Sequence, residues 1–285
     1  MTIDNISKSV LDLDKTLDCG ETFRWMKVGK YWVGVVDNNL IQLEQLEKSN
    51  QIRTNLPDNL ESKYWFIKYF DLCTDYSGID RLDLSNDRFA RESIEAGKGI
   101  RILRQDLWET MVSFIISQQN NIPKIKKTIY KLCDIAGRPV NLPGPLWGID
   151  DKTVKTLLTL KTFPTASEIV QHEQEILEQC PLGYRANYVL TMAHKYQHNY
   201  TKYAMGLTCL DPANQTASLL REKGIGPKVA SCISLFALHN TASFPIDVWV
   251  KRIIDTYYNG NIDISKYGEY AGIIQQYMFY NIRNK

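Results

Sequence analysis

Long apolar runs, paired cysteines and an excess of one charge are all missing from this chain. No stretch of 18 apolar residues occurs among its 285 residues, which excludes a membrane-spanning helix. The first residues, MTIDNISKSVLDLD, carry acids and no apolar run, so we expect no signal peptide and a soluble chain. Lys and Arg total 34 against 32 Asp and Glu, and a net charge of +2 provides no basic field over the whole molecule. Affinity for a polyanion would have to come from local clusters, of which we note Lys124, Lys126, Lys127 and Lys131, and Lys251 with Arg252.

The cysteines argue against a metal centre. They stand singly, with no C-x-x-C pair and no histidine partners at zinc spacing, so reduced thiols in a cytosol are the simplest interpretation. No cysteine follows Cys232, which excludes a four-cysteine iron–sulfur loop after Asp247. We therefore expect no metal site and no cofactor. The six are Cys19, Cys73, Cys133, Cys180, Cys209 and Cys232.

What the chain does have is a change of periodicity near residue 100. Before it, short aromatic or β-branched runs separated by turn residues predict antiparallel strands at Thr22–Val28, Tyr31–Val36 and Leu40–Leu46. After it, the apolar period is helical. We predict an α+β fold, with a small N-terminal antiparallel sheet domain (residues 1–100) followed by an all-helical body (101–285). The predicted helices are Tyr64–Leu72, Asp87–Ala96, Gln105–Ser117, Ile122–Ile135, Asp151–Leu158, Ala166–His172, Tyr184–Gln197, the pair described next, and Ile264–Ile282.

The most informative stretch is a predicted helix-hairpin-helix at about residues 213–239. Its turn is Gly224-Ile225-Gly226, followed by Pro227 at the first position of the second helix, where a missing N–H costs nothing. Gly224 and Gly226 suit backbone with φ > 0, and without a Cβ they let a phosphate approach the N–H groups. The hairpin therefore predicts an anion site made of main chain, which grips a nucleic-acid backbone without recognising its sequence. The sequence leaves open whether a monovalent cation assists it.

Two reactive side chains flank this site. Lys228 lies in the first turn of the second helix, and Asp247 is predicted to cap the N-terminus of the next one. A helix from Pro227 to His239 is about 18 Å long, and the seven residues after it span up to about 23 Å, so the chain can return Asp247 beside Lys228. Taken singly, a Gly-x-Gly turn before a lysine is a weak signal and Asp247 is an ordinary helix cap.

The chemistry that this pair predicts is attack on a sugar carbon. A free lysine has a pKa near 10.4, and lowering it to about 7 costs roughly 4 to 5 kcal/mol. Burial and the positive end of the helix both favour that change, whereas a carboxylate in contact would oppose it. We therefore expect Asp247 beside the sugar, where it stabilises positive charge at C1′. Lys228 would then form an imine with the opened sugar, which permits β-elimination of the 3′ phosphate.

Two other segments have open interpretations. Gln118-Gln119-Asn120-Asn121 is either a loop that ends a helix or a set of amides that fill the space of a flipped-out nucleotide and bond its orphaned partner base. Tyr184 is either a buried core residue or a plate that stacks beside that partner base.

The hairpin, the lysine and the capping aspartate together resemble the helix-hairpin-helix DNA glycosylases, in which a lysine at this position marks the members that also cleave the strand. Further segments sharpen the resemblance to the 8-oxoguanine DNA glycosylases with lyase activity, from about Gly20 to Phe279. The family's first domain is an antiparallel sheet domain. The matching segments are CGETFRW (19–25), 117–122, 183–188, 224–232, Pro245-Ile246-Asp247, and Tyr270-Ala271-Gly272 with Gln275 and Phe279.

The resemblance implies a role for each matching residue. Lys228 is the nucleophile and Asp247 its catalytic carboxylate. The Gly20 carbonyl accepts from N7–H of the oxidised base, whereas normal guanine presents a lone pair there, at a cost of about 1 to 3 kcal/mol. Cys232 and Phe279 sandwich the purine and Gln275 meets its Watson–Crick edge. Core packing is the alternative interpretation of both Cys232 and Phe279. DNA contacts are implied for Gln119, Asn120, Lys124, Tyr184, Arg185, Gly224, Gly226 and Val229.

Three positions depart from the animal members of the family, which carry Asn, Arg and His where this chain has Gln119, Lys124 and Trp249. An Arg fork can grip the partner cytosine bidentately, whereas Lys is a point charge. We therefore predict weaker discrimination of the base opposite the lesion. Trp249 cannot supply an imidazole contact to phosphate.

The sequence thus predicts a bifunctional base-excision repair enzyme, an N-glycosylase and AP lyase for 8-oxoguanine in double-stranded DNA. We expect a monomer in the cytoplasm, associated with the nucleoid in a bacterium or located in the nucleus in a eukaryote. One alternative is a helix-hairpin-helix glycosylase for another lesion such as alkylated purines, although those generally lack the lysine. The other is a non-catalytic DNA-binding module that uses the hairpin as a phosphate clamp.

Overall fold

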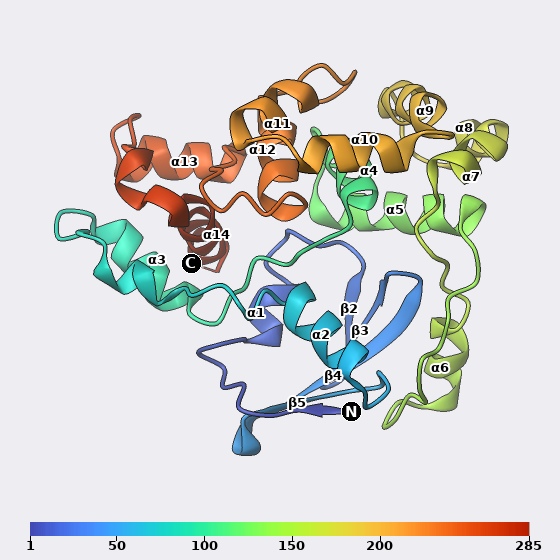
Figure 1. The fold of residues 1–285 in the computed structure, drawn as a ribbon, viewed down its shortest axis with the longest axis horizontal. Coiled ribbons are helices and arrows are strands. Elements are labelled where there is room, and N and C mark those ends of the chain that lie inside the picture. Colours follow the sequence, from blue (N-terminus) through green and yellow to red (C-terminus); the bar gives the residue numbers. More distant parts are fainter. Residues whose placement is uncertain (285) are drawn as a thin grey trace.

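The computed structural model describes residues 1–284 and confirms the predicted α+β architecture, a five-stranded antiparallel sheet followed by a mostly helical body (Figure 1). The three predicted strands are present as β2, β3 and β4. Two further strands were missed because β1 has only two residues and β5 lacks a long apolar run. The sheet order is β1-β5-β4-β3-β2. The bounds are β1 Thr2–Ile3, β2 Trp25–Val28, β3 Tyr31–Val36, β4 Asn39–Leu46 and β5 Gln51–Thr54.

Tight turns fix the register of the central strands. Val28 pairs with Tyr31 across a two-residue turn, and Val36 pairs with Asn39 across another. Asp37 and Asn38, in the second turn, have φ of 46° and 69°. Two successive positive φ values are typical of the hairpin turn whose twist matches that of the strands. The turn residues in the sequence therefore placed both hairpins correctly.

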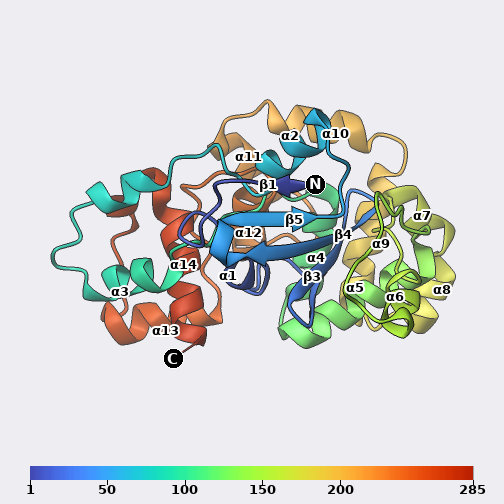
Figure 2. The same cartoon turned by 90° about the horizontal axis from the view of Figure 1, so that it is seen from below.

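Each face of the sheet is covered by a different part of the chain. On one face Trp25, Trp32 and Ile41 pack with Phe66 and Phe70, which come from α2 and the residue after it. The other face packs against a segment from beyond residue 136, since Val33, Val35 and Leu40 contact Leu157 of α6. Backbone hydrogen bonds join the same segment to the β3–β4 turn. The helical body thus sends one excursion back over the sheet (Figures 1 and 2).

The predicted helices are present, with ends that differ by a few residues. Short ones at α1, α8 and α10 were missed because each offers little apolar periodicity. The last predicted helix is divided into a 3₁₀ segment and α14, and Gly268, with φ of 53°, has a non-helical backbone inside the 3₁₀ segment. The bounds are α1 Leu13–Leu17, α2 Leu60–Tyr69, α3 Arg88–Gly97, α4 Leu107–Ser117, α5 Ile122–Ala136, α6 Asp151–Leu157, α7 Ala166–Gln171, α8 Glu173–Gln179, α9 Arg185–Tyr196, α10 Tyr200–Thr208, α11 Pro212–Leu219, α12 Pro227–Phe236, α13 Val248–Tyr257 and α14 Ala271–Arg283, with 3₁₀ turns η1 Glu47–Ser49, η2 Ser77–Arg81 and η3 Ile264–Tyr270.

One large apolar core joins the helices and includes residues from the first hundred. Phe23, Phe89 and Ile94 pack in the same cluster as the buried faces of α4, α12 and α14. Figure 2 shows α3 beside α13 and α14, apart from the sheet. The domain boundary near residue 100 stays a prediction, since side chains on both sides of it share this core. Within residues 1–284, no helix combines the length and the apolarity needed to cross a lipid bilayer.

Candidate active site

The helix-hairpin-helix is formed by α11, the turn at residues 220–226 and α12. Gly224 has φ of +88°, and a Cβ there would lie 2.5 Å from the ring of Tyr188, so both conformation and packing require glycine. Gly226 is different, because its φ is −92°, and the expectation of a positive φ there was wrong. A Cβ on Gly226 would meet nothing within 4 Å, so the backbone there is open to an approaching group. Pro227 occupies the first turn of α12 as predicted.

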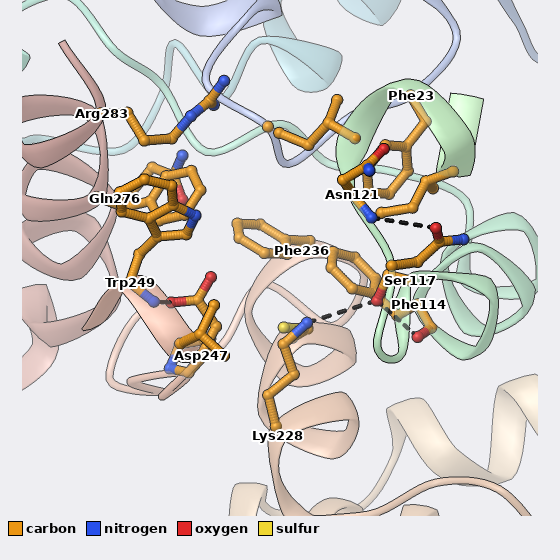
Figure 3. Close-up of a pocket in the computed structure, with 18 of the residues that line it drawn as sticks. Phe23, Phe114, Ser117, Asn121, Lys228, Phe236, Asp247, Trp249, Gln276 and Arg283 are labelled. Carbon is orange, nitrogen blue, oxygen red and sulfur yellow. Dashed lines mark hydrogen bonds between the residues drawn. The ribbon is translucent and has the colours of Figure 1, made fainter. Parts of the chain in front are cut away.

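Lys228 stands in the first turn of α12 with its side chain half-buried. Its Nζ lies 3.5 Å from Oγ of Ser117, at the end of α4, and 5.3 Å from the centre of the Phe114 ring. Figure 3 shows the amine pointing away from the start of its own helix and toward these α4 residues. The Phe114 ring, the Ser117 hydroxyl and the Cys232 thiol flank the amine, and its remaining side faces the cavity described below.

Asp247 caps α13 as predicted, since its Oδ1 accepts from the N–H groups of Trp249 at 3.0 Å and Val250 at 2.8 Å. The helix before it was predicted too long, because α12 ends at Phe236 and His239 has φ of 55°. The return loop is held against its surroundings by backbone hydrogen bonds, from Asn240 to Ser234 at 2.8 Å and from Gly272 to Thr241 at 2.7 Å.

These elements meet at a cavity of about 450 Å³, a size that suits one small ligand. Figure 3 shows Lys228 and Asp247 directed at the same space from the starts of α12 and α13. Among the described residues the two form no ion pair, and the place of Asp247 beside a sugar stays a prediction. The cavity lining brings together all residues predicted for catalysis and base recognition, namely Lys228, Asp247, Gly20, Cys232, Gln275 and Phe279.

The wall opposite the amine is built by α14 and the loop before β2. Gln275 is 4% exposed, and its Oε1 has no hydrogen-bond partner within residues 1–284. A buried amide oxygen without a partner costs free energy unless something else satisfies it, so it indicates a polar ligand in the cavity. Phe279 is also buried, and the guanidinium of Arg283 lies 5.3 Å from its ring centre.

Gly20 fits tightly into this wall. Its φ of +89° lies in the region that favours glycine. A Cβ there would lie 3.0 Å from Nη1 of Arg283 and 3.1 Å from carbons of Ile122 and Phe279. The backbone therefore passes the cavity at a distance that no other residue allows without displacement.

Cys232 faces the cavity one turn after Lys228 on α12. Burial raises the pKa of its thiol to about 11; the charge of Asp247 acts in the same direction and the amine of Lys228 opposes it. The thiol is therefore protonated at neutral pH, and it offers a polarisable, uncharged surface to a ligand. No group of three or more His, Cys, Asp or Glu among residues 1–284 is arranged to hold a metal ion.

Comparison with known families agrees with this geometry. Residues 4–111 match the model of the 8-oxoguanine DNA glycosylase N-terminal domain. Residues 112–269, more than half of the chain, match the HhH-GPD superfamily of base excision DNA repair proteins. The chain belongs to the 8-oxoguanine DNA glycosylases of the HhH-GPD superfamily.

Individual relatives resemble this glycosylase over most of its length. An N-glycosylase/DNA lyase from Saccharomyces cerevisiae is 30% identical over 273 residues, covering 87% of this chain and 68% of the relative. The structure of MBOgg1 with a low-affinity DNA ligand is 32% identical with a TM-score of 0.84, covering 99% and 95% of the two chains. The 8-oxoguanine glycosylase/lyase of Clostridium acetobutylicum, solved with double-stranded DNA that has cytosine opposite 8-oxoguanine, is 29% identical with a TM-score of 0.83, covering 99% and 94%.

The amide loop of the glycosylase lies at the rim of the cavity. Gln119 is exposed with φ of 47°, and Asn120 lines the cavity. Gln118 is used internally, because its Nε2 donates to the Gly224 carbonyl at 2.8 Å and so joins this loop to the hairpin. Arg185 donates from Nε to the Gln118 carbonyl at 2.8 Å, so its guanidinium supports the loop. The sequence had predicted Arg185 as a DNA contact only.

Three other predicted DNA contacts have different surroundings. Tyr184 is 49% exposed, so its interpretation as a core residue was wrong. Lys124 is exposed in the first turn of α5, whereas Lys126 from the same basic cluster donates to the Trp25 carbonyl at 3.3 Å. Val229 is 3% exposed, so its side chain cannot contact DNA and only its backbone N–H, in the first turn of α12, is suited to do so.

Several lining residues of the cavity were missed from the sequence. Gln276 is 2% exposed on α14, and two adjacent buried amides in an apolar helix were a signal that was available. The aromatic rings gave no such signal, because an aromatic residue on a helix is ordinarily core. The missed residues with direct access to the cavity include Phe23, Phe114, Phe236, Trp249, Gln276 and Arg283.

Proposed function

We propose that this enzyme excises 8-oxoguanine from double-stranded DNA with Lys228 as nucleophile and Asp247 as the carboxylate that stabilises the reacting sugar. The observation that carries the proposal is the shared cavity, which is lined by the Lys228 amine, the Asp247 carboxylate and the buried Gln275 amide. Among the described residues, Oε1 of that amide has no partner. An extrahelical nucleotide would place its base against Gly20, Gln275 and Phe279 and its sugar between Lys228 and Asp247.

The first chemical step replaces the base by the enzyme. Nζ of Lys228 bonds to C1′ as the N-glycosidic bond breaks, and the base departs with the bonding electron pair and takes up the proton that the attacking amine loses. Positive charge develops at C1′ during this step, and a fixed carboxylate in a site sheltered from water stabilises it without reorganisation. Asp247 suits that role because the two N–H groups at the start of α13 hold one of its oxygens in place.

The second step cleaves the strand. Opening of the sugar converts the C1′–N bond into an imine, which acidifies the hydrogen at C2′. Loss of that proton places a double bond between C2′ and C3′ and expels the 3′ phosphate as leaving group. The positive pole of α12, with free N–H groups beside Gly226, supports the phosphate through main-chain contacts.

Contacts to the rest of the duplex follow from the exposed rim. Asn120 lines the cavity, exposed Gln119 precedes it in the same loop, and exposed Tyr184 lies beside Arg185, which supports that loop. The vacated space in the helix and the orphaned partner base would lie near these side chains. The hairpin backbone at Gly224 and Gly226, with the Val229 N–H, would hold phosphate, and Lys124 and Arg185 would add positive charge. We propose that the enzyme acts on DNA as a monomer.

Borohydride added during incubation with a duplex that contains 8-oxoguanine tests the proposal. We expect a covalent protein–DNA complex, since borohydride reduces the imine to a stable amine, and peptide mapping should locate the adduct at Lys228. Undamaged duplex and duplex with an alkylated purine serve as controls that should give none. Absence of an adduct with lesion DNA, or an adduct at another lysine, would contradict the proposed role.

A further inference from the structure

The backbone around Gly20 is held on both sides by glutamine side chains. Gln276 on α14 donates from Nε2 to the Cys19 carbonyl at 3.0 Å. Gln105, just before α4, donates from Nε2 to the Glu21 carbonyl at 3.0 Å. Within residues 1–284 the Gly20 carbonyl between them accepts no hydrogen bond. Of three successive carbonyls, the outer two are therefore occupied and the central one is left for a ligand.

Both glutamines are themselves anchored to elements that line the cavity. Gln276 is buried in α14, beside Gln275 and one turn before Phe279 and Tyr280. The backbone N–H of Gln105 donates to the Phe236 carbonyl at 3.1 Å, at the end of the helix that carries Lys228. The two amides thus fix the Gly20 loop relative to α14 and to α12. Figure 3 shows Gln276 across the cavity from Lys228.

The other contacts of this loop involve the side chains of Cys19 and Glu21. The Cys19 thiol donates to the Thr16 carbonyl at 3.0 Å, lies 3.3 Å from Oε1 of Glu21 and is approached by the Glu21 backbone N–H. The other carboxyl oxygen of Glu21 has no partner among the described residues, and burial raises the pKa of this carboxyl well above its usual range. Among the described residues, no side chain other than Gln276 and Gln105 donates to the carbonyls of Cys19, Gly20 or Glu21.

We propose that Gln276 and Gln105 are positioning residues that set the Gly20 carbonyl for recognition of the oxidised base. The inference rests on the proposed function, in which the base lies against Gly20, and on the contact that the family resemblance implies, from N7–H of 8-oxoguanine to the Gly20 carbonyl. Hydrogen bonds weaken steeply when the distance or the angle departs from a narrow range. Selection of N7–H over a lone pair at the same atom depends on that one contact. Two amides that prevent rotation of the flanking peptides therefore give the carbonyl its selectivity.

The test compares two reactions of one protein. Excision of 8-oxoguanine needs the carbonyl, whereas cleavage at a preformed abasic site has no base to recognise. We expect Gln276→Leu and Gln105→Leu each to slow single-turnover excision by about tenfold to a hundredfold, because a misplaced contact at a reacting site costs rates of this order. Cleavage at a preformed abasic site should change by less than about threefold, since its contacts are unaltered.

A matched control is available in the sheet domain. Gln42 is fully buried and its amide pairs with the backbone of Trp147, through Nε2 to the carbonyl at 2.8 Å and from the N–H to Oε1 at 3.0 Å. Gln42→Leu removes a comparable buried amide far from the cavity. It should lower the melting temperature while leaving the ratio of excision to abasic-site cleavage unchanged.

A pH profile separates positioning from packing. In Gln276→Glu a protonated carboxyl can donate to the Cys19 carbonyl, whereas an ionised one repels it. The ratio of excision to abasic-site cleavage should therefore fall as the pH rises in this variant and stay flat in Gln276→Leu. If both reactions fell together in both leucine variants, or if neither ratio changed, the inference would be wrong. Wild-type protein that failed to excise 8-oxoguanine would refute the proposed function instead.

Discussion

The cavity has two walls that are built in different ways. The reaction wall consists of Lys228 and Asp247, each in the first turn or at the cap of its own helix and each half-buried. The recognition wall consists of Gly20, Gln275 and Phe279, where an N-terminal loop packs against the last helix and the side chains are buried. The reaction wall depends on local helix starts, which supply N–H groups and dipoles wherever the helix lies.

The recognition wall depends on contacts between the two ends of the chain, and this difference has a functional consequence. Chemistry and base selection are carried by separate structural elements, so a substitution can impair one and spare the other. Abasic-site cleavage reports the reaction wall alone, and excision of 8-oxoguanine reports both. The predictions that follow use this pair of reactions, from the largest expected effect to the smallest.

Lys228→Gln should remove both reactions. The amide cannot form an imine, so we expect excision and strand cleavage to fall by about a thousandfold or more, while binding of lesion DNA is largely preserved. Single-turnover assays and a binding titration measure this. Lys223→Gln, which changes an exposed hairpin lysine bonded to Asn187, is the matched control and should keep both activities. Residual imine trapping in Lys228→Gln would break the assignment of the reaction wall.

Asp247→Asn should impair chemistry with little loss of stability. Asparagine caps a helix about as well as aspartate, so the N–H groups of Trp249 and Val250 keep a partner and the fold should lose less than about 1 kcal/mol. The charge beside the sugar disappears, and excision should fall by about a hundredfold to a thousandfold. Asp211→Asn makes the same change at the cap of α11, away from the cavity, and should leave excision unchanged. Equal rates in wild type and Asp247→Asn would show that Asp247 is only a cap.

Gly20→Ala should affect the recognition wall selectively. The added Cβ meets Arg283, Ile122 and Phe279 at 3.0 to 3.1 Å, and a φ of +89° strains alanine by about 1 to 2 kcal/mol. We expect excision of 8-oxoguanine to fall about tenfold or more, with a smaller effect on abasic-site cleavage. Gly29→Ala, at φ of +60° with nothing within 4 Å, imposes a similar backbone strain elsewhere. If Gly29→Ala lowered the ratio of excision to abasic-site cleavage as much as Gly20→Ala, backbone strain and not contact with the cavity would be the cause.

Lys124→Arg should increase the selectivity for the base opposite the lesion, and it changes no residue of the reaction wall or the recognition wall. Lys124 is exposed at the start of α5 and provides a point charge, whereas arginine can bond a base edge bidentately. We expect the preference for cytosine over adenine opposite the lesion to rise about fivefold, near the low end of what one bidentate contact provides. Lys127→Arg, exposed further along α5, is the control. A wild-type preference as steep as that of the variant would remove the basis for this prediction.

The same contrast between walls explains what the sequence could predict. The helix-hairpin-helix, the place of Lys228 and the cap at Asp247 depend on local patterns, and all three are present in the structure. The fit of Gly20 against Phe279 and the role of Gln276 depend on which distant segments pack together, and local periodicity carries no such information. The family resemblance implied roles for Gly20 and Phe279 but none for Gln105 and Gln276. The short strands β1 and β5 were missed for a related reason, since two to four residues carry too little pattern.

The most direct test of the two-wall arrangement is the structure of Lys228→Gln bound to a duplex that contains 8-oxoguanine. We predict the oxidised base inside the cavity between Cys232 and Phe279, with N7 within hydrogen-bond distance of the Gly20 carbonyl and C1′ beside residues 228 and 247. A lesion held outside the cavity, or a base whose N7 faces away from Gly20, would contradict the arrangement.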